Sequence, residues 1–107
     1  MNLLCNCKAL TNIKVAADVG ADPLWCAICG YNLDMDKVEV SDSLKETLRL
    51  WIDEYGNWVD WESDILIDRA VHIEKQHNEL GLKITEKVKD ELNGKYNIVF
   101  APSLMTK

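Results

Sequence analysis

The chain has few of the residues that break or stiffen a backbone: two prolines and five glycines among 107 residues. That composition excludes collagen-like and low-complexity classes and is typical of one globular domain. No run approaches the roughly 20 apolar residues that a membrane-spanning helix requires. The sequence also contains no G-x-S-x-G, no P-loop, no dinucleotide-binding fingerprint and no H-E-x-x-H. No motif of this kind therefore predicts an enzyme.

The chain also lacks an excess of basic over acidic residues. The chain carries 18 acidic and 12 basic side chains, which gives a formal net charge of −6. Proteins gain most of their affinity for nucleic acids by neutralising phosphates, so an acidic chain is a poor candidate for binding them. The basic residues towards the C-terminus are too sparse to reverse this expectation; they are Lys83, Lys87, Lys89 and Lys95.

An export signal is missing as well. A signal peptide needs a basic segment and roughly 7–15 apolar residues before its cleavage site, whereas only four residues precede Cys5. We therefore expect a cytoplasmic protein. In that reducing compartment, clustered cysteines favour metal or redox chemistry over structural disulfides.

Four cysteines are present, and their spacing is the most informative pattern in the chain. Cys5 and Cys7 form C-x-C, and Cys26 and Cys29 form C-x-x-C-G after a gap of eighteen residues. Two close thiol pairs separated by the length of a hairpin have the ligand pattern of a tetrahedral zinc site. We therefore predict that these four cysteines bind Zn²⁺.

The segment Trp25–Gly30 resembles the metal-binding turns of the zinc-ribbon and rubredoxin-like families, and the resemblance covers residues 3–34. It implies a structural zinc site, closed by four protein ligands, rather than a catalytic site with an open position. In those families both ligand pairs usually have two intervening residues. Cys5 and Cys7 have one, so the backbone at Asn6 must bend before both sulfurs can reach one metal.

Two alternatives remain open for the cysteines. A zinc site can combine Cys7, Cys26 and Cys29 with a different fourth ligand, for which His72 and His77 are the histidine candidates. The other alternative is a thiol oxidoreductase that uses the C-x-x-C pair. Thioredoxin-like pairs lie in a βαβ pattern, however, and no such pattern surrounds this pair.

The periodicity of apolar residues predicts an α+β fold: an N-terminal four-cysteine zinc-ribbon-like β unit, two to three helices and one C-terminal strand. The expected strands cover residues 3–8, 11–16 and 96–100. The expected helices run from Ser41 or Ser43 to Gly56, from Trp61 to Leu80 with Gly81 as the stop, and from Thr85 to Leu92. Within one domain, residues 1–107, we distinguish a zinc-binding β subdomain (1–35), a helical region (41–94) and a strand (95–101) that can join the N-terminal sheet.

Acidic residues and histidines suggest further metal sites, each with a simpler interpretation. Asp60, Asp64 and Asp68 would share one helix face, which usually means a solvated face. Glu74 and His77 have the spacing of half a di-iron site, but the second half is missing. His77 is therefore expected to be a hydrogen-bonded residue in the core or at its boundary.

Four large aromatic residues lie within eleven positions. Trp51 and Tyr55 belong to the apolar stripe of the first expected helix, so we expect them in the core. The pattern does not predict whether Trp58 and Trp61 are buried or exposed. Exposed aromatics are frequent in binding hot spots, and beside acidic residues they would suit a basic protein partner.

These observations favour a small cytosolic protein–protein interaction module with a structural zinc site and no enzymatic activity. The second hypothesis is a nucleic-acid-associated zinc ribbon, because many ribbons of this kind serve transcription or translation. The third is the thiol oxidoreductase. The chain as a whole resembles small uncharacterised bacterial proteins with a cysteine-rich N-terminus, which implies no activity, and the sequence predicts neither the partner nor the oligomeric state.

Overall fold

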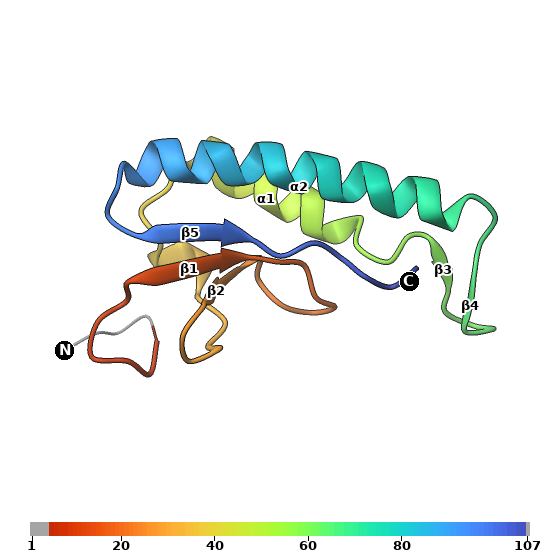
Figure 1. The fold of residues 1–107 in the computed structure, drawn as a ribbon, viewed down its shortest axis with the longest axis horizontal. Coiled ribbons are helices and arrows are strands. Elements are labelled where there is room, and N and C mark those ends of the chain that lie inside the picture. Colours follow the sequence, from red (N-terminus) through yellow and green to blue (C-terminus); the bar gives the residue numbers. More distant parts are fainter. Residues whose placement is uncertain (1–4, 107) are drawn as a thin grey trace.

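The computed structural model describes residues 5–106, and it has an α+β fold in which two helices cover one face of a small sheet (Figure 1). The strands of the sheet are β1 (Asn12–Val15), β2 (Leu24–Cys26) and β5 (Asn97–Phe100). The helices are α1 (Asp42–Asp53) and α2 (Ala70–Leu92), with a short 3-10 helix, η1 (Met35–Lys37), before α1. A two-stranded hairpin, β3 (Val59–Asp60) and β4 (Ile65–Leu66), separates the two helices.

The central strand of the sheet is β1, which pairs antiparallel with β2 and parallel with β5. Ile13 and Val15 alternate with polar neighbours and are fully buried, as their period of two predicts. The expectation that the C-terminal strand can join the N-terminal sheet is confirmed. The predicted strand 3–8 is wrong for residues 5–8, which are irregular; residues 3 and 4 lie outside the described part of the chain.

Helix α1 begins where its sequence signals place it. The side chain of Ser41 accepts a hydrogen bond from the backbone N–H of Leu44 at 3.1 Å, so Ser41 rather than Ser43 is the N-cap. Leu48 and Trp51 are buried on the predicted stripe. The helix ends at Asp53, and a turn through Gly56 leads to the hairpin.

Helix α2 corrects three expectations. The structure has one helix of 23 residues where the sequence predicts two, and Gly81 lies inside it rather than at an end. Thr85 is not an N-cap, because its hydroxyl donates to the carbonyl of Gly81 at 2.7 Å. The predicted helix start at Trp61 is also wrong, since residues 59–66 form the hairpin. The predicted end at Leu92 is confirmed, with Asn93 in a left-handed conformation.

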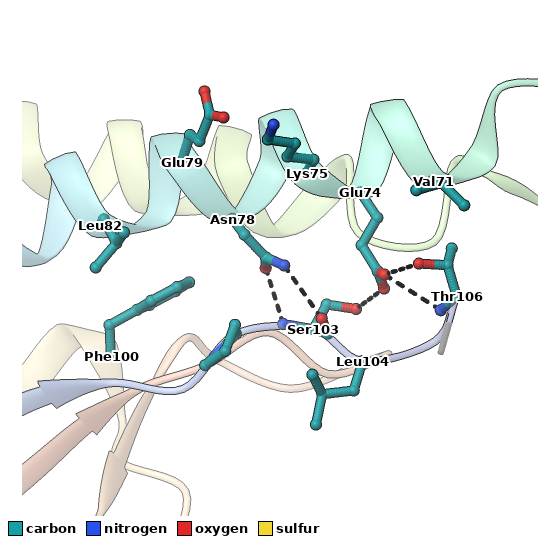
Figure 2. A pocket seen from close by; sticks show the side chains of 11 residues that line it. Val71, Glu74, Lys75, Asn78, Glu79, Leu82, Phe100, Ser103, Leu104 and Thr106 are labelled. Carbon is teal, nitrogen blue, oxygen red and sulfur yellow. Dashed lines mark hydrogen bonds between the residues drawn. The ribbon is translucent and has the colours of Figure 1, made fainter.

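The segment that follows β5 is held along α2 by two polar side chains (Figure 2). Asn78 exchanges two hydrogen bonds with the backbone of Ser103, at 2.8 and 3.1 Å. The carboxylate of Glu74 accepts from Ser103, Met105 and Thr106. Within residues 5–106, neither helix combines the length and the apolar character that crossing a membrane requires.

Candidate metal centre and protein-binding surface

The fold brings all four cysteines together at one end of the sheet. Cys26 is the last residue of β2, Cys29 lies in the turn that follows, and Cys5 and Cys7 lie in the irregular segment before β1. The four sulfur atoms lie within 4.8 Å of one another. Cys26 and Cys5 are buried, whereas Cys29 is exposed at the rim.

The distances between the sulfurs fit a tetrahedral metal ion. A zinc ion with Zn–S bonds of about 2.3 Å in a tetrahedron places its ligand sulfurs roughly 3.8 Å apart. The sulfurs of Cys7 and Cys26 lie 3.9 Å apart, which is about twice the length of a disulfide bond. The donor set, four soft sulfurs, is also one that zinc prefers over hard cations.

The turn around Cys26 and Cys29 has the geometry of a metal-binding knuckle. Gly30, with φ of 78°, donates its N–H to the carbonyl of Cys26 at 2.9 Å. A hydrogen bond from the backbone of Tyr31, and a second from the backbone of Asn6, lower the pKa of Cys29 to about 6. Since Asn6 lies between the other two cysteines, this bond links the C-x-C segment to the knuckle.

Cys7 differs from Cys29, because its environment favours the protonated thiol over the thiolate. Burial, together with hydrogen bonds in which the protonated Cys7 thiol donates to the other cysteines, raises the pKa of Cys7 to about 12. Four ionised sulfurs this close repel one another unless a cation lies between them. A divalent ion would supply that charge, so the residues present fit Zn²⁺.

Neither histidine belongs to this group. Among the described residues the cluster of ligand atoms contains the four cysteines alone. His72 is exposed on α2, and His77 is buried in the core beneath Trp51. The alternative site with a histidine as fourth ligand therefore has no support in the geometry.

His77 fills a position that the sequence only half predicts. Its ring stacks on Trp51 at 4.6 Å between centroids, and Trp58 and Tyr55 also contact it. It is buried as expected, but within residues 5–106 neither of its ring nitrogens has a hydrogen-bond partner, and nor does Nε1 of Trp58. Burial lowers the pKa of His77 below its ordinary value, and the negative charge of Glu74 opposes this shift only in part.

We expect this burial to make the stability of the protein sensitive to mild acid. Because the pKa of His77 is lower when folded, protonation favours the unfolded chain. The stabilisation is complete above the ordinary value of 6.5 and is lost as the pH falls below it towards the folded pKa. Urea denaturation between pH 7.5 and 5 should show a smaller loss of stability for His77→Phe than for the wild type. His72→Gln, at an exposed position, serves as the control and should follow the wild type; an unchanged slope in His77→Phe would contradict the expectation.

The remaining candidates take structural roles. Glu74 anchors the C-terminal segment, and burial, which alone would raise its pKa, is outweighed by hydrogen bonds from Ser103 and Thr106 that lower it. The predicted helix face of three aspartates is wrong, because Asp60 and Asp64 lie in the β3–β4 hairpin and Asp68 follows it.

The four aromatic residues divide between core and surface. Trp51 and Trp58 are buried and Tyr55 is half-buried, whereas Trp61 is 57% exposed on the hairpin. The helical pattern predicts the burial of Trp51, but it could not predict that Trp58 is buried and Trp61 exposed, because both follow the end of α1.

A groove of about 560 Å³ lies between α2 and the C-terminal segment, with mainly apolar walls that include Val71, Leu82 and Phe100 (Figure 2).

No curated protein matches the chain. A family model does match, described as Serratia CdiI immunity protein-like, and it covers residues 11–103. The match includes the whole sheet, both helices and the hairpin, with Cys26 and Cys29 but not Cys5 and Cys7. The matching family is not a zinc-ribbon family, although the cysteine cluster itself is present. Because the model spans most of its length, the chain belongs to the Serratia CdiI immunity protein-like family.

Proposed function

We propose that this protein is an immunity protein that binds a protein toxin and blocks its action. The family match over residues 11–103 carries the proposal, since an immunity protein acts on a protein partner. The expected protein–protein interaction role agrees with this membership. Binding of a toxin requires complementary surfaces rather than catalytic groups, so we propose no enzymatic reaction for the chain.

We further propose that Cys5, Cys7, Cys26 and Cys29 hold a structural Zn²⁺. The spacing of their sulfurs and the donor set support this assignment. When bound, the ion would neutralise the thiolates and cross-link the irregular segment before β1 to the end of β2. Thiolate ligands persist in a reducing compartment, which is why we propose the cytoplasm as the location.

The buried core supports the proposal that residues 1–107 form a single folded unit. The core extends from Ile13 and Leu24 in the sheet to Leu48 in α1 and Val88 in α2, so the two layers share their buried surface. Cys5 and Cys26 belong to the same buried cluster. We therefore propose that the β subdomain and the helical region fold together as one domain, with the metal site at the edge of their shared core.

Toxin neutralisation is the direct test of the proposed function. Candidate toxin domains from the same genome are expressed in a sensitive host with and without the full chain. We expect the chain to restore growth against one of them, and the purified pair to form a stable complex in size-exclusion chromatography. If the chain neither restores growth against any candidate nor binds one, the immunity function is wrong.

A further inference from the structure

The β3–β4 hairpin is the most exposed part of the described chain. All ten residues from Asp60 to Arg69 are exposed. Four of them are large and apolar: Trp61, Ile65, Leu66 and Ile67 are 57%, 62%, 46% and 38% exposed. Val71, just inside α2, is also exposed. Exposed apolar residues also line the groove beside α2, among them Leu82 and Leu104. The hairpin differs because it has four such residues within seven consecutive positions, 61 to 67.

This hairpin has a defined conformation. Val59 pairs with Leu66 and Asp60 with Ile65. The carboxylate of Asp60 accepts the backbone N–H of Glu62 at 3.0 Å and so closes the turn. Each strand is short, and the hairpin lies at the N-terminal end of α2 and points away from that helix (Figure 1).

The base of the hairpin is fixed to the core. Trp58 is fully buried directly before β3, and its carbonyl accepts the N–H of Ile67 at 2.9 Å. The Trp61 ring lies so close to Gly56 that a Cβ there would come within 2.8 Å of it. A surface ordered before binding loses less conformational entropy when a partner docks.

The charge of the same segment selects the class of partner. Four acidic residues are interspersed with the apolar residues along the segment, and Arg69 is the single basic residue among residues 59–71. The acidic residues are Asp60, Glu62, Asp64 and Asp68. A second copy of this chain, an anionic membrane or a nucleic acid would meet like charge at this surface. A basic protein surface would meet opposite charge.

We propose that residues 59–71, the docking hairpin, bind a basic face of the toxin, with Trp61 and Ile65 as apolar anchors inside an acidic rim. This inference rests on the proposed immunity function and locates its binding surface. Apolar anchors at the centre of an interface carry most of its affinity, whereas charges at the rim mainly raise the association rate.

The test measures binding of full-length variants to the toxin domain that the chain neutralises. We expect Trp61→Ala and Ile65→Ala each to weaken binding and so to raise the dissociation constant by about 30-fold or more. Leu50→Ala and Val99→Ala, at similarly exposed positions elsewhere, are matched controls and should stay within about twofold of the wild type. Circular dichroism and melting curves verify that each variant is folded, which the exposure of these side chains favours.

Charge is tested separately with Glu62→Gln combined with Asp64→Asn. We expect a slower association rate, with a weaker dependence on salt than the wild type and a nearly unchanged dissociation rate. Wild-type affinity in both anchor variants would overturn the docking hairpin while leaving the immunity function standing. A chain that dimerises alone, and becomes monomeric on Trp61→Ala, would assign the surface to a second copy and overturn the proposal too. If the wild type binds no toxin, the proposed function itself has failed.

Discussion

Replacing Cys26 by serine is expected to release one zinc ion and to unfold the part of the sheet formed by β1 and β2. Cys26 is buried at the end of β2, and a serine hydroxyl is a poor zinc ligand at neutral pH. Structural zinc contributes about 10–16 kcal/mol to the folding of finger-sized peptides, more than the whole stability of many small domains. Metal analysis of the purified protein should give one zinc per wild-type chain and none in Cys26→Ser, with a lost or strongly lowered melting transition.

Ala27→Ser provides the control for this experiment. Ala27 is exposed in the same turn. The substitution therefore introduces the same hydroxyl without removing a ligand, and the variant should keep both the zinc and the melting temperature of the wild type. Thiol labelling under reducing conditions separates the zinc site from the thiol oxidoreductase hypothesis. Four thiols that react only after denaturation or chelation support zinc. A native protein without zinc, in which the exposed Cys29 with its pKa near 6 reacts at once, would support the redox role instead.

Replacing Gly81 by alanine is expected to destabilise the protein, against the preference of helices for alanine. Helix propensity alone would favour the change by about 1 kcal/mol. A Cβ on Gly81 would, however, lie 2.5 Å from Cε1 of Phe100 and 2.8 Å from Cζ2 of Trp51. Forcing atoms into a packed core costs about 1–3 kcal/mol, so we expect a net loss for Gly81→Ala and a larger loss for Gly81→Val.

Thermal or urea denaturation measures this loss, and a second substitution tests its cause. Phe100→Leu removes the ring that the new Cβ would meet, so Gly81→Ala should cost less in that background than in the wild type. Lys83→Ala, at an exposed position two residues further along α2, should be nearly neutral. If Gly81→Ala raises the melting temperature, the close contact with Phe100 and Trp51 does not restrict this position.

The position of Gly81 also explains why the sequence predicted two helices where the structure has one. Glycine followed by a threonine that can cap a helix is a local signal for a stop and a new start. In the fold, that glycine provides the space in which α2 crosses Trp51 of α1 and Phe100 of β5. Those two partners are 30 and 19 positions away in the sequence, so no local pattern contains this information.

Elements with complete local signals were predictable. The stripe and serine cap of α1, the alternation in β1 and the C-terminal strand β5 all follow from short-range patterns. The cysteine cluster was predictable because ligand spacing is itself a local pattern, whereas the hydrogen bond from the backbone of Asn6 to distant Cys29 was not. The hairpin was missed because Ile65, Leu66 and Ile67 are apolar yet exposed, and periodicity assigns such residues to a core.

The parallel pairing of β1 with β5 has a consequence for how the protein is made. Ile13 lies opposite Ile98, so the central strand gains its second neighbour only after synthesis has passed residues 97–100. Until β5 leaves the ribosome, one edge of β1 has no strand beside it, and such an edge is prone to wrong pairing. Contacts so distant in sequence also close slowly. For the proposed immunity function, this means that a nascent chain without β5 would not yet present the complete sheet to a partner.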